Sequence, residues 1–134
     1  MLRLLLLATL TLVLSGKHAQ AEMWNCVVDR KIDSERVYTD SDIQKWQPRA
    51  ALIVTDAGAI IARCGFSIAS GNRETCDYYD ADRIEQDPVV GVIKAYYFRG
   101  QMDLQIYPNQ DGTGGTFVEN NGRGTISFGP CTVN

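Results

Sequence analysis

The stretch AYYFRGQMDLQIY, residues 95–107, decides the fold. After a turn around Gly100, the apolar residues Met102, Leu104 and Ile106 alternate with the more polar residues between them. Alternation with period two is typical of a β-strand that buries one of its faces. Two such runs on either side of a short glycine turn predict an antiparallel hairpin.

The partner strand of this hairpin carries an unusual outer face. A turn at Arg99-Gly100 or at Gly100-Gln101 places Ile93, Ala95 and Tyr97 on the buried face, since both registers preserve parity. The alternate residues then point outward and form what we call the outward stripe: Val90, Val92, Lys94, Tyr96 and Phe98.

Outward positions are normally polar, so an apolar and aromatic stripe needs a cover. A helical face carrying Ile43 and Trp46, or a closing loop, is the simpler expectation. The second expectation is a protein partner, which makes the outward stripe a candidate partner-binding surface.

Further short alternating segments fill the chain, separated by turn residues about every 8–12 positions, as in all-β domains. We predict a small antiparallel eight-stranded barrel or barrel-like sandwich, a lipocalin-like meander with one short helix and two disulfides. The candidate strands are 23–29, 50–56, 59–68, 73–79, 89–99, 101–107, 115–119 and 124–133.

Two segments have helical signals. Ser41 to Gln44 reads as a capping box that opens a short helix, and Pro48 ends it. Residues 80–87 are predicted to form a helical turn or two before Pro88.

Asn121-Gly122 lies between two alternating runs and predicts a two-residue type I′ hairpin. In that register Phe117 faces Ile126, and Glu119 becomes a diagonal neighbour of Arg123. The polar segment is therefore interpreted as a turn and not as a binding loop.

Residues 1–21 have the pattern of a cleaved signal peptide. Arg3 precedes an apolar run of about 11 residues, and Ala19-Gln20-Ala21 offers small residues for cleavage. The run is too short to span a bilayer, which takes about 20 residues, so no membrane anchor is expected after cleavage. We expect residues 22–134 to be a single β domain, in a bacterial periplasm or secreted.

Cleavage changes the charge and the chemistry of the chain. Without Arg3 and Lys17, 11 basic residues remain against 16 acidic ones, a net charge of −5. This acid excess argues against nucleic acid as a partner. The only histidine, His18, is also lost, and with it every Ser-His or Cys-His nucleophile pair. We therefore expect no catalytic residues, no cofactor and no enzyme.

Four cysteines remain, an even number, which in an exported chain favours disulfides over free thiols. Of the three possible connectivities we favour Cys64–Cys76, across neighbouring strands, and Cys26–Cys131, between the first strand and the last. Cys131 is out of phase with Phe128, so a bulge at Gly129-Pro130 is predicted to turn its side chain inward.

The acidic segment 77–87 contains a weak calcium candidate, Asp80, Asp82 and Glu85, without the order of an EF-hand loop. No other metal site is predicted. Carboxylate pairs also leave open a glycosidase-type hydrolase, the least favoured alternative.

We expect an exported, soluble, non-catalytic binding protein that engages a protein partner in the envelope, for example as an inhibitor or accessory protein. The other alternative is a lipocalin-like carrier of a small apolar ligand, which would need a hollow interior.

Overall fold

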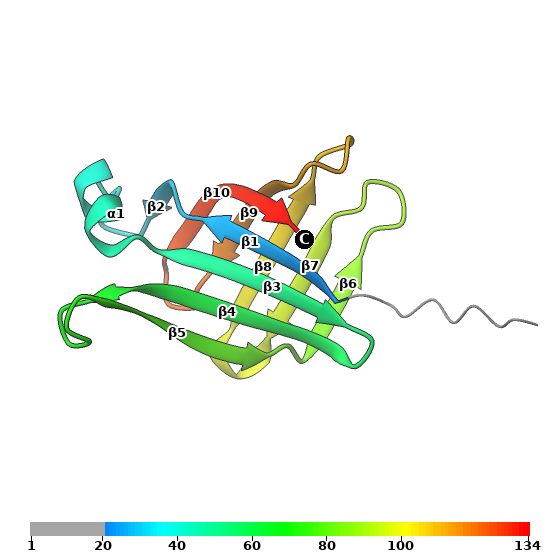
Figure 1. Cartoon of the computed structure of the whole chain (residues 1–134), viewed down its shortest axis with the longest axis horizontal. Helices are drawn as coiled ribbons and strands as arrows, with labels where there is room; N and C mark the ends of the chain where they lie inside the picture. The colour runs from blue at the N-terminus through cyan, green and yellow to red at the C-terminus, as the bar shows by residue number, and fades with distance from the viewer. Residues whose placement is uncertain (1–20) are drawn as a thin grey trace, which may run out of the picture.

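The computed structural model describes residues 21–134, so the predicted leader lies outside the described residues except for Ala21. The fold is all-β with one short α-helix (Figure 1). No helix in residues 21–134 is long and apolar enough to span a bilayer. The elements are β1 (Glu22–Val27), β2 (Arg30–Ile32), α1 (Asp40–Trp46), β3 (Arg49–Thr55), β4 (Gly58–Ser67), β5 (Arg73–Asp80), β6 (Arg83–Gln86), β7 (Ile93–Tyr97), the 3-10 turn η1 (Phe98–Gly100), β8 (Met102–Pro108), β9 (Gly115–Asn120) and β10 (Ile126–Val133).

The strands form one antiparallel sheet in the order β5-β4-β3-β1-β10-β9-β8-β7-β6, and β2 pairs with β10 beside this path. The prediction of a closed eight-stranded barrel is wrong, because the nine-stranded path is a curled half-barrel with β5 and β6 as its edges. The first and last strands do pair, as expected. However, β1 also pairs with β3, so the contact between the chain ends lies inside the path and does not close it.

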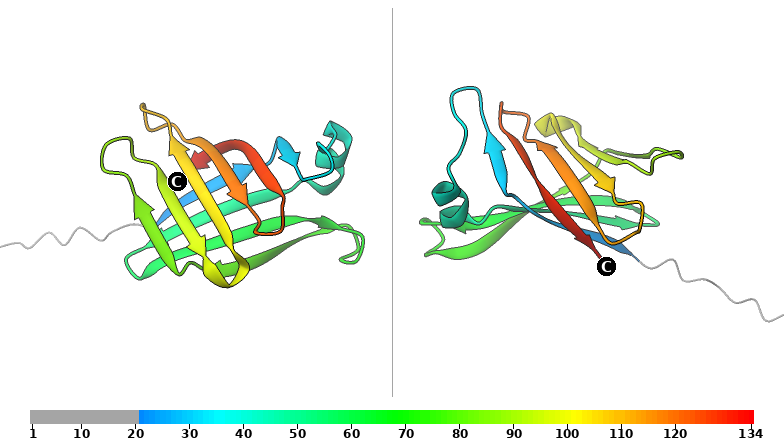
Figure 2. Two further views of the ribbon diagram at one scale, coloured as in Figure 1. Left: turned by 180° about the vertical axis from the view of Figure 1, so that it is seen from behind. Right: turned by 90° about the horizontal axis from the view of Figure 1, so that it is seen from above.

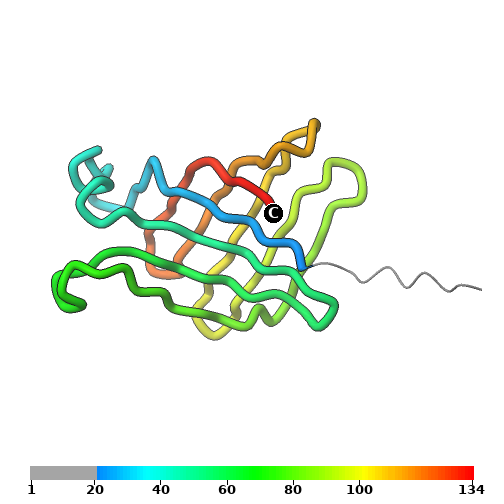
Figure 3. The backbone as a smooth tube through the Cα atoms, viewed as in Figure 1, coloured from blue at the N-terminus to red at the C-terminus, as the bar shows by residue number. Residues whose placement is uncertain are grey.

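The two edge strands follow one another in the chain and are joined by Ala81 and Asp82. The amide of Ala81 donates to the carbonyl of Ala59 in β4 at 2.9 Å, and the amide of Asp82 donates to the carbonyl of Tyr96 in β7 at 2.8 Å. This link carries the chain from one end of the sheet path to the other. In Figure 1, β3, β4 and β5 cross in front of the slanted strands β7, β8 and β9, and the view from behind in Figure 2 shows the slanted strands in front. The backbone tube follows the same crossing (Figure 3).

The core lies between these two parts of the sheet. Leu52 of β3 and Ile61 of β4 meet Leu104 and Ile106 of β8, and all four have no exposed surface. Burying one such side chain contributes about 1.5–3 kcal/mol relative to leaving it exposed. The interior of the half-barrel is therefore filled with side chains.

The β7–β8 hairpin has the predicted faces. Ile93 pairs with Ile106 and Ala95 with Leu104, all four buried. The turn between the strands is η1, whose C-cap Gln101 has a left-handed backbone. Strong alternation on both sides of Gly100 was enough to predict these faces, and of the two registers left open the pairing of Tyr97 with Met102 corresponds to the one with its turn at Arg99-Gly100.

The segment predicted as a helical turn, residues 80–87, instead ends β5 and forms β6, which pairs with β7. Its carboxylates are typical of the first turn of a helix and Pro88 is typical of the segment that follows a helix, but such residues serve equally well on an edge strand that faces water and in the turn after it. The predicted strand 89–99 is correspondingly shorter, because residues 87–92 form the turn between β6 and β7.

Helix α1 begins two residues earlier than the predicted box. Its N-cap is Thr39, whose hydroxyl accepts from the Asp42 amide at 3.2 Å while the Asp42 carboxylate accepts from the Thr39 amide at 3.0 Å. Gln47 closes the helix in a left-handed conformation, just before Pro48, as predicted.

The β9–β10 hairpin differs from its prediction in register. Phe117 pairs with Gly129, not with Ile126, and the strands are joined by a five-residue loop, 121–125. The Asn121 side-chain oxygen accepts from the amides of Arg123 (2.8 Å) and Thr125 (3.1 Å), which holds this wider loop. The Asn-Gly pair therefore supports a turn, but not the two-residue type.

The corrected register also removes the predicted bulge. Ser127 and Cys131 now point inward together with Phe117, and Phe128 points outward. Cys131 is in phase with its own strand and lies opposite Cys26. Both predicted disulfides, Cys26–Cys131 and Cys64–Cys76, are present, and each joins directly paired residues of neighbouring strands. Disulfides of this kind are typical of an oxidising compartment.

Gly129 is the tightest position of the new register, because a Cβ there would collide with the carbonyl group of Val27. We predict that Gly129→Ala lowers the free energy of unfolding by about 1–3 kcal/mol, the usual cost of overpacking. Urea denaturation measures this loss. Thr132→Ala, an exposed change on the same strand, is the control, and equal stability of Gly129→Ala and wild type would contradict the register.

Candidate functional site

The outward stripe is divided between a strand and two turns. Lys94 and Tyr96 lie on the outer side of β7, whereas Val90 and Val92 belong to the 87–92 turn and Phe98 opens η1. The structure therefore brings the five predicted residues to one side of the molecule without making them a continuous strand face.

No described element covers this surface. The expected cover, the face of α1 with Ile43 and Trp46, is wrong, because α1 packs against β2 and β4 and Ile43 contacts the core from there. Val90 keeps 65% of its surface exposed and Phe98 keeps 59%. Within residues 21–134 the two ends of the stripe are therefore open to solvent, whereas Val92, Lys94 and Tyr96 between them are partly buried.

At one end of the stripe, Tyr96 and Phe98 form an aromatic pair. The rings of Tyr96 and Phe98 lie 6.3 Å apart between centroids, at an interplanar angle of 35°. The Tyr96 hydroxyl donates to Glu85 of β6 at 3.3 Å, which fixes the ring over the neighbouring strand. The hydrogen bond orients one ring of the pair, and the other ring, Phe98, is largely exposed.

The other end of the stripe, from Val90 to Lys94, lines two open grooves. Val90 and Val92 line a groove of about 980 Å³ with Tyr107 and Pro108 at the end of β8. Val92 also joins Lys94 in an adjoining groove of about 490 Å³. Val89, next to Val90, is 88% exposed, so this apolar surface is wider than the stripe that the sequence indicated.

The calcium candidates have other roles. Asp82 accepts a hydrogen bond from the Phe98 amide at 2.7 Å, and Glu85 forms an ion pair with Arg83. The oxygen atoms of Asp80, Asp82 and Glu85 do not come together as a set of donors within 4.8 Å. The one such set found in residues 21–134 contains Cys64 and Cys76, whose sulfur atoms are joined in a disulfide.

An ion pair that the sequence did not predict joins β4 and β9, with its carboxylate buried and its guanidinium group partly exposed. Glu119 of β9, only 4% exposed, accepts a charge-assisted hydrogen bond from Nε of Arg63 in β4 at 2.9 Å. The predicted neighbour of Glu119 was Arg123, a consequence of the wrong β9–β10 register. Parity with Phe117 was the available signal that Glu119 points inward.

Burial sets the ionisation of this cluster. Loss of hydration raises the pKa of Glu119 above its usual value, and the attraction of Arg63 opposes this rise only in part. Lys31 of β2 lies nearby, and its pKa is lowered, first by burial and then by repulsion from Arg63. Burial therefore disfavours the charged forms of both Glu119 and Lys31. Because the Glu119 carboxylate is enclosed, we interpret the cluster as part of the structure and not as a binding site.

No protein-family model matches the chain, and neither the curated proteins nor the solved structures contain a match. What the outer surface of β7 can do follows from its composition. It offers an aromatic pair, exposed valines and open grooves, and it brings together no group of metal ligands in the described residues.

Proposed function

We propose that the protein is an exported, non-catalytic binding protein that engages a protein partner through the outward stripe. The observation that carries the proposal is the uncovered apolar surface over β7 and its two flanking turns. Exposed apolar patches with polar rims mark protein interaction sites, and aromatic residues supply much of the binding energy at such sites.

The rim of the surface supports a protein partner over a lipid or a nucleic acid. Glu85 and Asp87 stand beside Lys94 along the adjoining groove. Mixed charges around an apolar centre are typical of protein interfaces. An anionic membrane or a nucleic acid would instead select a cluster of lysine and arginine side chains.

The filled interior weighs against the carrier alternative. A lipocalin-like carrier encloses its ligand within the barrel, where Leu52, Ile61 and Leu104 are packed together with no exposed surface. The hydrolase alternative gains no support either, because the most buried carboxylate, Glu119, is held by Arg63 and faces the core.

The test is capture of a partner from an envelope extract by immobilised wild-type protein and by the double variant Tyr96→Ser/Phe98→Ser. We expect the double variant to lose at least about tenfold in affinity for the captured protein, since two aromatic anchors are removed. Ile68→Ser, a change at another exposed apolar residue on the β4–β5 turn, is the matched control and should capture as wild type does.

Equal capture by the wild type and the double variant would contradict the proposal. Circular dichroism of both variants should match the wild type, because Phe98 and Ile68 are exposed and Tyr96 lies outside the core. The comparison then reports on the surface and not on folding.

A further inference from the structure

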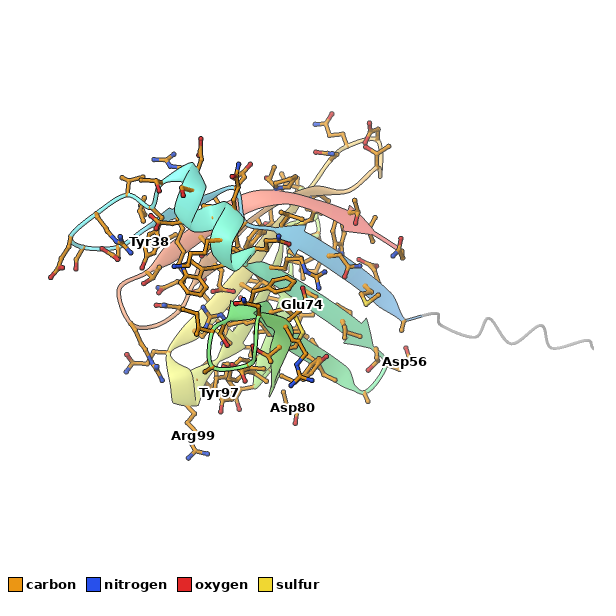
Figure 4. The ribbon with its side chains drawn as sticks, turned by 60° about the vertical axis from the view of Figure 1, so that its left-hand side comes forward. Tyr38, Asp56, Glu74, Asp80, Tyr97 and Arg99 are labelled. Atoms are coloured by element: carbon orange, nitrogen blue, oxygen red, sulfur yellow. A yellow bond between two sulfur atoms is a disulfide. The ribbon has the colours of Figure 1, made fainter. Side chains whose placement is uncertain are left out.

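A second surface feature lies where η1 meets the 121–125 loop. It is a pocket of about 350 Å³, lined among others by Arg63, Asp77, Tyr79, Tyr97, Arg99 and Arg123. These residues come from β4, β5, β7, η1 and the β9–β10 loop. Figure 4 shows Tyr97 and Arg99 at this end of the molecule, with Arg99 extending from its edge. Pockets of this size hold small ligands.

Three arginines from separate elements line the pocket, and the side chains of Arg99 and Arg123 are exposed at its rim. Arg63 is held in place by its ion pair with Glu119. Neither Arg99 nor Arg123 forms an ion pair with a carboxylate of residues 21–134. The protein as a whole has a net charge of −3, so a cluster of three arginines is a local exception to its acidic composition. Guanidinium groups match the planar geometry of a carboxylate and bind it with two parallel hydrogen bonds.

One wall of the pocket is aromatic. The rings of Tyr79 and Tyr97 lie 5.1 Å apart between centroids, at an interplanar angle of 49°. Both tyrosines are partly buried against the core, and Met102 beside them is buried. This wall therefore offers an apolar aromatic surface to a ligand in the pocket.

The rim that carries two of the arginines is preformed. A Cβ at Gly100 would lie 2.9 Å from the ring of Tyr97. A Cβ at Gly122 would collide with the carbonyl groups of Gly100 and Gln101. The two turns are therefore packed backbone to backbone beside Arg99 and Arg123, and a rim that is already formed reduces the entropy lost on binding.

Asp77 narrows the class of ligand. Its carboxylate would repel a simple anion in the same pocket, but it accepts hydrogen bonds from hydroxyl groups. A ligand that satisfies the whole lining carries a carboxylate for the arginines, hydroxyl donors for Asp77, and a flat apolar face for the tyrosines. We propose that this pocket binds a small polyhydroxylated carboxylate of the uronic acid type, at a site separate from the outward stripe.

Isothermal titration calorimetry of the full domain with D-glucuronate tests the proposal, with D-glucose and acetate as the two partial ligands. We expect glucuronate to bind with a dissociation constant of about 1 mM or tighter. Glucose lacks the carboxylate and acetate lacks the hydroxyls, so each should bind at least about tenfold more weakly.

The double variant Arg99→Gln/Arg123→Gln should lose glucuronate affinity by at least about tenfold, because its two free guanidinium groups are gone. Arg83→Gln, which removes an exposed arginine of β6 outside the pocket, is the matched control and should bind as the wild type does. Glucuronate binding that does not saturate, acetate binding as tight as glucuronate, or equal binding by the double variant and the control would each overturn the proposal. None of these results depends on whether the outward stripe binds a protein.

Discussion

Replacing Cys26 and Cys131 together with alanine is expected to lower the free energy of unfolding by about 4.7 kcal/mol in the chain-entropy model. The link joins residues 105 positions apart, so its removal frees nearly the whole chain in the unfolded state. Both sulfur atoms also lie in the core, with the residues 1% and 5% exposed, so their loss leaves a small void. Urea denaturation, followed by tryptophan fluorescence, measures the effect.

The second disulfide supplies the matched comparison. Cys64 and Cys76 lie 12 positions apart on β4 and β5, and neither is fully buried. The pair Cys64→Ala/Cys76→Ala is expected to cost about 3 kcal/mol, less than the long-range link. A larger loss from this pair than from Cys26→Ala/Cys131→Ala would contradict the assigned roles of the two disulfides.

Arg63→Ala is expected to lower the free energy of unfolding by about 3 kcal/mol, because it leaves the Glu119 carboxylate buried without its partner. Arg49→Ala is the control. Arg49 forms its ion pair with Glu74 where both side chains are substantially exposed, so its loss should cost at most about 1 kcal/mol. Similar losses from the two variants would show that Glu119 is not enclosed as described.

The same variant should change the pH dependence of stability. The pKa of Glu119 is raised in the folded protein, so the folded state binds its proton more tightly than the unfolded state does. Its contribution to stability is therefore present at low pH and is lost as pH rises through the folded pKa.

Removing Arg63 takes away the main attraction that opposes this rise, so the pKa of Glu119 should increase further. Chemical denaturation at about pH 5 and about pH 8 should show a larger penalty for Arg63→Ala at the higher pH. The double variant Arg63→Ala/Glu119→Gln, which has no carboxylate to titrate, should lose this extra dependence. An equal penalty at both pH values would contradict the assignment.

The sequence was sufficient to predict the structure where only one local pattern was present. The hairpin of β7 and β8 has uninterrupted alternation on both sides of Gly100, and its buried and outward faces were predicted correctly. The two disulfides followed from strand adjacency, since Cys64 and Cys76 flank one turn and the other pair joins the terminal strands.

The sequence was misleading where a local turn signal competed with the wider register. Asn121-Gly122 favours a two-residue turn, but the Asn121 side chain holds a five-residue loop, and the shift inverted the predicted face of β10. The unexplained phase of Cys131 was a sign of this error. The bulge predicted at Gly129-Pro130 was needed only because the predicted β9–β10 register is wrong.

Long-range features could not be inferred from local patterns. Strand β6 has one apolar residue, Ile84, and is a strand only because β7 supplies its partner. Ala81 and Asp82 lead directly from one edge to the other, but β5 and β6 do not pair, so the sheet stays open. The arginine-lined pocket brings together residues as distant as Arg63 and Arg123, which no spacing in the sequence indicates.

Site-specific photo-crosslinking tests most directly the claim that the outward stripe meets a protein partner. A photoreactive phenylalanine analogue at Phe98, in the full chain expressed in its native cells, should give one discrete crosslinked protein adduct. The same analogue at Val37, an exposed apolar residue outside the stripe, should not give this adduct. An identical crosslinking pattern from both positions, or no adduct from Phe98, would contradict the account.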